Sequence, residues 1–221
     1  MSSPSTPTRG RPARLDQART VETALELLDE SGLDALTMRR LADAMGVQAG
    51  ALYRYFATKQ DLLTAMAERM LADVLAPTED GDWSERLTGL ARSMRTALLA
   101  HRDGARVYAG THSTGANTLG FADAAIGVLR EAGFGDEDAA RTLMALANFT
   151  LGHTLEEQAA LQPGNEAPAD AGQLREAVTA GAYPHLTATL PVFTSTDFAA
   201  HFEFGLRLLV EGLKAHREQQ A

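Results

Sequence analysis

The sequence predicts an all-α protein with two unequal domains. Apolar residues recur at helical spacing in the segments between turn signals, and no stretch alternates between apolar and polar residues for long. A polar stretch, Glu79-Asp80-Gly81-Asp82, separates the helical segments into a shorter and a longer group. These observations favour helices packed on helices and argue against a sheet.

The N-terminal residues predict a disordered arm followed by a long helix. Residues 1–13 are rich in Ser, Thr, Pro and Gly, a composition that is typical of disordered segments. The first helix is expected from residue 15 to residue 31, with Val21 and Leu25 on its apolar face. Gly32 supplies the signal that ends it.

Residues 36–56 predict two short helices joined by a tight turn. Leu41 lies on the apolar stripe of the first helix, and Gly46 can adopt the positive φ that ends a helix. Leu52 and Phe56 are four residues apart, which places both on the inner face of the second helix. Small residues, Gln and Arg are expected to face outward. The small residues let the helix backbone come close to DNA, and the Gln and Arg side chains can bind base edges. The segment therefore predicts a helix-turn-helix that reads the major groove.

A capping box at residues 58–61 opens a connector helix, for which Pro77 is the expected end. The domains are then an arm at 1–13, the helix-turn-helix domain at 14–60, the connector helix at 61–77 and an effector-binding and dimerisation domain at 78–221. In this last domain, further helices are expected near residues 83–101, 104–110, 118–132, 136–160, 171–181 and 197–216. Residues 162–168 predict a loop.

Composition limits the classes of protein that fit. The chain has no Cys, which excludes disulfides and thiolate metal sites. No apolar window approaches the length of a membrane span, so we expect a cytoplasmic protein without a membrane partner. The net charge of −9 is unevenly divided. Residues 1–60 carry eight Lys and Arg against seven Asp and Glu, so the acidity belongs to the part that would face away from DNA.

Several segments carry a resemblance to a known family. Residues 21–33, together with the signature Leu52-Tyr53-x-Tyr55-Phe56-x-x-Lys59, resemble the DNA-binding domain of TetR-family regulators. Residues 97–107, 149–158 and 204–213 resemble the tetracycline-repressor branch of that family, so the resemblance spans roughly residues 14 to 215. It implies a ligand-responsive transcriptional repressor, not an enzyme.

The resemblance also implies a homodimer on a palindromic operator in double-stranded DNA. The apolar stripe at 197–216 fits either the core of one chain or a helix–helix dimer interface. Family members build their dimer from the helices that match 136–160 and 197–216, which favours the dimer. A two-fold dimer also doubles the short site that one recognition helix reads.

The DNA-binding candidates divide into base readers and phosphate contacts. The resemblance implies that Arg39 reads guanine and that Gln48 and Arg54 face the groove. Hydroxyl, phenol and ammonium groups suit phosphates, which fix register without reading sequence. Alternatively, the two tyrosines only pack the helix pair, and the arginines of the arm either touch DNA or belong to an untethered tail. The candidates are Thr37, Arg39, Gln48, Ala49, Tyr53, Arg54, Tyr55 and Lys59.

The effector pocket that the resemblance implies departs from the tetracycline repressors. Those proteins bind their drug as a Mg²⁺ chelate, and the ligand positions correspond here to Tyr108, Asn148 and Glu156. Neither Tyr nor Asn replaces an imidazole as a metal donor. Leu75 and Leu90 stand at polar drug-contacting positions, so the pocket becomes more apolar. We therefore expect a small, largely apolar or aromatic organic effector, with no obligatory metal and no cofactor.

Two further interpretations stay open for these residues. The apolar candidates can instead belong to the core, and the chain can be a DNA-binding dimer without a small-molecule response. An enzyme that uses His112 or His153 with Glu156 is another alternative, although no nucleophile elbow, phosphate loop or two-His metal motif supports it. The effector candidates are Leu75, Leu90, Met94, Tyr108, Thr111, His112, Asn148, Phe149, His153 and Glu156.

Overall fold

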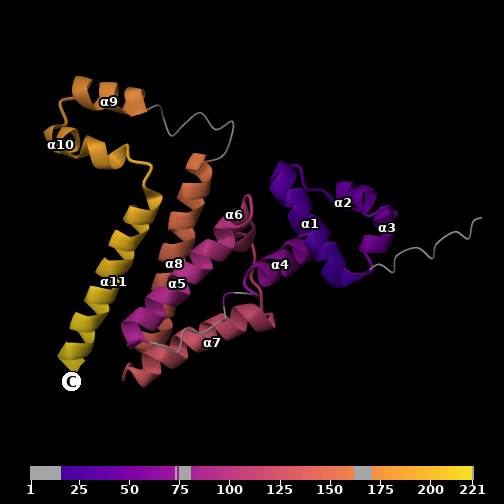
Figure 1. The fold of residues 1–221 in the computed structure, drawn as a ribbon, viewed down its shortest axis with the longest axis horizontal. Coiled ribbons are helices and arrows are strands. Elements are labelled where there is room, and N and C mark those ends of the chain that lie inside the picture. Colours follow the sequence, from indigo (N-terminus) through magenta and orange to yellow (C-terminus); the bar gives the residue numbers. More distant parts are fainter. Residues whose placement is uncertain (1–15, 73, 75–80, 162–170, 221) are drawn as a thin grey trace, which may run out of the picture.

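The computed structural model describes residues 16–72, 74, 81–161 and 171–220, and the regular structure of these residues is helical (Figure 1). The all-α prediction is therefore confirmed. The predicted arm and Leu75 lie outside the described residues. The helices are α1 (Gln17–Ser31), α2 (Met38–Ala44), α3 (Ala49–Leu52), α4 (Lys59–Met70), α5 (Trp83–Leu99), α6 (Gly104–Ala109), α7 (Ala116–Glu131), α8 (Asp136–Leu161), α9 (Ala171–Ala180), α10 (Pro184–Phe193) and α11 (Phe198–Gln220).

The first three helices form the helix-turn-helix unit. α1 ends at Gly32, which has a φ of 79° and whose N–H donates to the carbonyl of Leu28 at 2.7 Å. Gly46 has the expected positive φ, 67°, in the turn after α2. Leu52 and Phe56 are 0% and 1% exposed, so the inner face of the second short helix packs as its spacing predicts.

The connector helix α4 begins as predicted and ends earlier. The Thr58 hydroxyl accepts the N–H of Asp61, and the Asp61 carboxylate accepts the N–H of Thr58, which completes the capping box. The helix ends at Met70 instead of near Pro77, because the N–H of Ala72 bonds to the carbonyl of Arg69 and tightens the last turn. α4 packs on α1, α6 and α7, so it touches both halves of the molecule.

The larger domain is a helical bundle built around α5, α7 and α8, with α11 along α8 (Figure 1). Its core includes Leu87, Leu129 and Phe202, each at most 1% exposed. A second core cluster joins the helix-turn-helix unit to α4, α5 and α6. Leu90 and Leu143 pack against both clusters, so the two cores are continuous.

One helix was absent from the sequence-based expectation. α10 begins with Pro184 at its first position, where the missing N–H costs nothing, and Pro191 lies inside it. Two prolines within eight residues obscured the helix. α10 packs on α9, and this pair projects from the bundle beside the start of α11 (Figure 1).

Candidate DNA-binding surface and effector cavity

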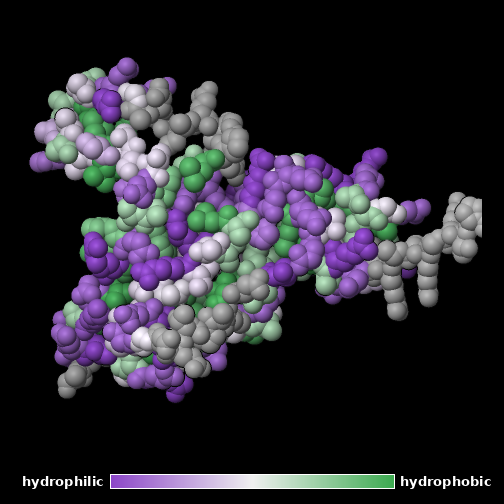
Figure 2. Space-filling view, viewed as in Figure 1, coloured by the Kyte–Doolittle hydropathy of each residue, from purple (hydrophilic) through white to green (hydrophobic). Residues whose placement is uncertain are grey.

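The helix-turn-helix lies at the end of the molecule opposite α11 (Figure 1). Its outward residues are exposed, among them Arg39, Gln48 and Arg54. Tyr53 and Tyr55 are 50% and 43% exposed, far more than a tyrosine whose only role is to pack two helices. From residue 37 to residue 59 the chain carries three Arg and one Lys against one Asp, and hydrophilic side chains cover much of this end (Figure 2).

The local hydrogen bonds leave several candidate groups available to a ligand. The Thr37 hydroxyl oxygen accepts the N–H of Arg40 at 3.1 Å, which leaves its own hydrogen free to be donated. Gln48 stands at the N-cap of α3 but its side chain makes no capping hydrogen bond. Lys59 differs, since it is half-buried and its Nζ lies 3.5 Å from the carbonyl of Leu33. Lys59 therefore also ties α4 to the segment after α1.

The recognition segment is shorter as a regular helix than its sequence pattern. α3 covers only Ala49–Leu52, and the chain continues as turns in which the N–H groups of Tyr55 and Phe56 bond to the carbonyl of Leu52 at 2.9 and 3.0 Å. This helical path still turns Arg54 away from the buried Leu52, whereas Ala49 is partly buried and packs against the core. The DNA contacts of these residues stay predictions.

At the other end, a cavity of about 490 Å³ lies between α8, the end of α10 and the start of α11. We call it the aromatic cavity. Three effector candidates line it, namely Phe149, His153 and Glu156. Sequence reasoning missed Val192 and Phe193 because α10 was not predicted, and it missed Phe198 and His201 although the Phe-rich start of α11 was a visible signal. Besides the three candidates, the walls are Gly152, Val192, Phe193, Ser195, Phe198 and His201.

His153 is the most distinctive group in this cavity. Its ring centroid lies 6.0 Å from that of Phe149, 6.4 Å from that of Phe198 and 5.3 Å from that of Phe202. Its buried Nδ1 has no hydrogen-bond partner. Burial lowers the pKa of His153 and outweighs the opposing effect of the Glu157 carboxylate, 3.9 Å away. The neutral imidazole is therefore the stable form near pH 7, and it offers an unpaired ring nitrogen.

The Glu157 carboxylate next to His153 is paired with the guanidinium of Arg95. Arg95 donates to both oxygens of Glu157 at 2.7 Å and the guanidinium lies 5.1 Å from the ring centroid of Phe202. Glu157 is only 6% exposed, and a buried charge of this kind requires such pairing. The cavity wall consequently stays apolar apart from His153, His201, Ser195 and the exposed Glu156.

The other effector candidates do not reach the aromatic cavity in the described chain. Leu90 lines a separate cavity of about 300 Å³ between α5 and α7, and Met94 is 1% exposed in the core. The Thr111 hydroxyl donates to the carbonyl of Tyr108 at 2.9 Å, and burial, followed by the nearby Glu68 charge, raises the pKa of Tyr108. The two remaining candidates are exposed, on the α6–α7 loop and on α8: His112 and Asn148.

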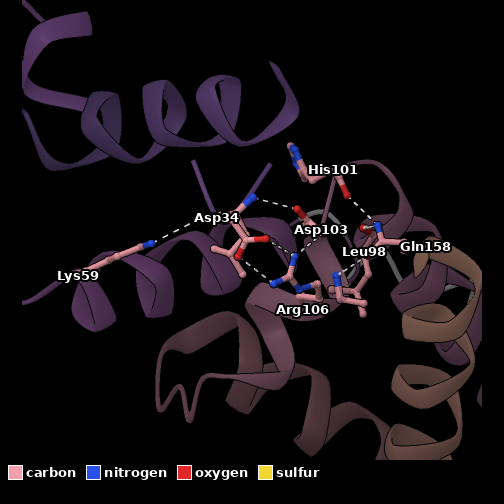
Figure 3. Close-up of polar contacts among 9 residues, drawn as sticks. Asp34, Lys59, Leu98, His101, Asp103, Arg106 and Gln158 are labelled. Carbon is pink, nitrogen blue, oxygen red and sulfur yellow. Dashed lines mark hydrogen bonds and ion pairs between the residues drawn. The ribbon is translucent and has the colours of Figure 1, made fainter. Parts of the chain in front are cut away.

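A polar contact joins the helix-turn-helix unit to α6 (Figure 3). The Asp103 carboxylate accepts the N–H of Leu33 at 2.8 Å and the guanidinium of Arg106 at 3.2 Å. Arg106 also pairs with Asp34 at 3.1 Å. Asp103 is 3% exposed and lies at a positive φ of 58°, which Asp tolerates better than most residues. We call these four residues the Asp103 clasp.

Gln158 fixes the same region to α8 (Figure 3). Its side chain accepts the N–H of Ala105 at 2.9 Å and donates to the carbonyls of Leu98 and His101 at 3.0 and 2.8 Å. All the hydrogen-bonding groups of this 9% exposed amide except one lone pair are thus used. α6 is therefore bound on one side to the helix-turn-helix unit and on the other to the helix that carries His153.

Within the described residues, no group of three or more His, Cys, Asp or Glu side chains is arranged to hold a metal ion. No helix in that part of the chain is both long and apolar enough to cross a membrane.

A helix-turn-helix joined to an all-α domain that contains a cavity is the architecture of a DNA-binding regulator. Residues 21–66 match the family described as bacterial regulatory proteins, tetR family, and residues 76–217 match the tetracyclin repressor-like C-terminal domain. The chain belongs to the TetR family and is a TetR-like transcriptional repressor. It is not an enzyme, because the members of this family are regulators.

Individual relatives cover nearly the whole chain. The tetracycline repressor protein class A from transposon 1721 of Escherichia coli is 44% identical over 208 residues, which are 92% of this chain and 93% of the relative. The crystal structure of a possible TetR family transcriptional regulator from Streptomyces coelicolor A3(2) superimposes with a TM-score of 0.85 over 90% of this chain and 99% of that chain. The two sequences are 73% identical. The Streptomyces coelicolor protein ActR in complex with actinorhodin is 35% identical, with a TM-score of 0.83 over 93% and 99%.

Proposed function

We propose that the protein acts in the cytoplasm as a homodimer that binds a palindromic operator, and that a small, largely apolar or aromatic organic effector releases it without an obligatory metal. The observation that carries this proposal is the placement of two sites at opposite ends of one continuous core. An exposed basic helix-turn-helix lies at one end and the aromatic cavity at the other, with α6 bonded toward both.

On DNA, Arg39, Gln48 and Arg54 are the proposed base readers. Each is exposed on the outer face of the helix-turn-helix, and Ala49 lets the backbone come close to the groove. Tyr53 and the hydroxyl of Thr37 supply donors for phosphates, as do Tyr55 and Lys59.

The outer faces of α8 and α11 support the dimer. Met144 on α8 and Phe204 and Leu208 on α11 are 63%, 55% and 57% exposed. Outside its own helix, Gly212 on α11 has no atom within 4 Å of the place of a Cβ, so the backbone there is open to close approach. A second copy of the same chain covers such a face on both subunits at once, because a two-fold interface is self-complementary.

The aromatic cavity suits the expected effector class. Its walls are mostly Phe, Val and the aromatic face of His153, with a few polar groups that fix orientation. The relative ActR was crystallised with actinorhodin and other relatives are tetracycline repressors, so known effectors nearby in the family are organic ligands. The effector acts by binding more tightly to a state in which the α6 segment has shifted and the recognition helices are spread.

The proposed operator binding is tested with the DNA upstream of the protein's own gene. Fluorescence anisotropy across a salt series compares this duplex with a scrambled duplex of equal length. Specific binding with a steep salt slope is expected. Arg54→Ala is expected to reduce the preference for the specific duplex by about 1–3 kcal/mol, while Arg175→Ala on the exposed α9 leaves it unchanged. Equal, weak binding of the wild-type protein to both duplexes would contradict the proposal.

The proposed response to an effector is tested by adding a panel of fused-ring aromatic compounds, actinorhodin and minocycline among them, and measuring release of this DNA. Substitution of Phe198 by Ala enlarges the cavity and is expected to weaken release while DNA affinity is kept. Bulky substitutions at Tyr108 or Asn148 are also expected to alter release and spare DNA affinity. A protein that binds its operator but responds to none of the panel would favour the alternative of a DNA-binding dimer without a small-molecule response.

A further inference from the structure

A carboxylate on α4 holds the start of α7. Glu68 accepts hydrogen bonds from the hydroxyls of Ser113 and Thr118 at 2.6 and 2.8 Å. It also accepts the backbone N–H of Thr118 at 3.2 Å and that of Asn117. These two N–H groups belong to the first turn of α7, where a helix has no internal acceptors for them. Glu68 therefore caps α7 from a different helix.

The surrounding atoms are built around this contact. The Asn117 amide donates back to the backbone carbonyl of Glu68 at 3.0 Å. A Cβ at Gly115 would overlap the Glu68 carboxyl group, so only glycine leaves room for it. Burial acts to raise the pKa of Glu68, but the hydrogen bonds together outweigh burial and lower it. The carboxylate is thus ionised near neutral pH, which strengthens its bonds to the helix N-terminus.

The same helix also holds the other end of the α6–α7 loop. The side chain of Gln60 donates to the carbonyl of Gly110 at 2.7 Å. The loop between these two attachments contains Thr111 and His112, two of the effector candidates. Since α4 begins directly after the helix-turn-helix, its orientation sets where the recognition segment lies.

We propose that Glu68 is a positioning residue whose bond to the start of α7 fixes α4 in the orientation that binds operator DNA. The inference rests on the proposed DNA-binding function and adds to it the group that transmits a change in the α6–α7 loop. With the bond closed, α4 and the helix-turn-helix are preorganised, so less freedom is lost on binding DNA. With the bond open, α4 is free to tilt and operator affinity falls.

Linkage supplies a quantitative test. If DNA binds more tightly when the Glu68 bond is closed, then DNA must stabilise the closed bond by the same factor. The first measurement is hydrogen exchange in the peptide that covers residues 113–121 of the wild-type protein, with and without operator duplex. We expect DNA to slow exchange at Asn117 and Thr118 by about fivefold or more.

The second measurement is the operator Kd of Glu68→Gln, which keeps the size of the side chain and removes its charge. Its Kd should rise by the same factor by which DNA slows exchange in the wild-type protein, and its exchange at residues 113–121 should no longer respond to DNA. The matched control is Glu22→Gln, which breaks the ion pair between Glu22 on α1 and Arg69 on α4 at 2.6 Å without touching α7. This control should keep the DNA-dependent exchange.

The outcomes separate the inference from the function on which it rests. If the wild-type protein binds no operator, the proposed function fails. If it binds operator but exchange at Asn117 and Thr118 does not change, the positioning role is wrong, and this result needs no variant to fold. Operator binding by Glu68→Gln that equals or exceeds that of Glu22→Gln also overturns the inference.

Discussion

A single buried carboxylate, Asp103, shows how one residue type meets several demands at once. Its backbone lies at a positive φ, where the short polar side chain of Asp costs less than most others. Its side chain satisfies the N–H of Leu33 and one side of Arg106. Gly32, whose Cβ would come within 3.0 Å of the Asp103 carboxylate, has a φ of 79°, which favours glycine at that position. The contact between the two domains thus depends on two adjacent constraints.

Removal of this carboxylate should be costly for stability. Asp103→Ala leaves the partly buried N–H of Leu33 without its acceptor, breaks the bond to Arg106 and places Ala at a positive φ. We expect a loss of about 2–4 kcal/mol in the free energy of unfolding, measured by urea denaturation. Asp34→Ala is the control, because Asp34 pairs with the same Arg106 but its side chain is 87% exposed, and it should cost less than about 1 kcal/mol. Equal losses in the two variants would contradict the assignment.

His153 should make stability depend on pH. Burial lowers its pKa in the folded protein, so the unfolded chain binds more protons than the folded one below the ordinary histidine pKa. Stability is then present above that pKa and is lost as pH falls toward the lowered value. The urea concentration at the midpoint of unfolding of the wild-type protein is expected to be lower at pH 5.5 than at pH 7.5. The same decrease should be smaller for His153→Gln. An identical pH dependence in both proteins would show that His153 does not contribute.

At the scale of helices, α8 and α11 approach closely because Gly205 has no side chain. A Cβ there would lie 2.5 Å from the ring of Phe149, which stacks on Phe202 in the core. Gly205→Ala should therefore lower stability by about 1–3 kcal/mol through overpacking. The control is Gly127→Ala inside α7, where a Cβ meets open space, and the better helix propensity of Ala should leave it within about 1 kcal/mol of the wild type. Thermal unfolding followed by circular dichroism compares them, and a harmless Gly205→Ala would refute the packing argument.

The helices that could be predicted from sequence are those with local signals. Gly32, Gly46 and the Thr58–Asp61 capping box mark boundaries through their own backbone chemistry, and the structure has all three. α10 lacks such signals because Pro191 lies inside it, and the early end of α4 comes with a tightened last turn that no residue type in the sequence marks. A local sequence pattern therefore does not predict these features.

The two candidate sites also differ in how far local sequence signals predict them. Helical spacing around Leu52 and Phe56 predicts the exposed Arg54 and Tyr55 of the helix-turn-helix, although Ala49, also expected to face out, packs partly buried against the core. The aromatic cavity was predicted only in part. Its walls come from α8, α10 and α11, and no spacing rule brings Phe149 and Phe193 together across more than forty residues.

For the whole molecule, the distribution of charge and apolar surface assigns a role to each end. Residues beyond 60 carry 12 Lys and Arg against 22 Asp and Glu, so this acidic part repels DNA while the basic segment at residues 37–59 faces it. This arrangement favours one docking orientation. The exposed apolar faces of α8 and α11 lie on the opposite, acidic half, where a second copy can be joined without blocking either recognition segment (Figure 1).

The proposed dimer is therefore the feature on which the proposed binding of a palindromic operator by the whole molecule depends. Leu208→Glu should leave the single chain folded, because Leu208 is 57% exposed there, but in a two-fold dimer it buries two new charges in one interface. Light scattering after size exclusion should show a monomer, and affinity for the palindrome should fall by about a hundredfold or more. Leu119→Glu, on α7 and 56% exposed, should keep the dimer mass. A Leu208→Glu protein that stays dimeric would place the interface elsewhere, since no symmetric contact across that residue tolerates two unpaired carboxylates.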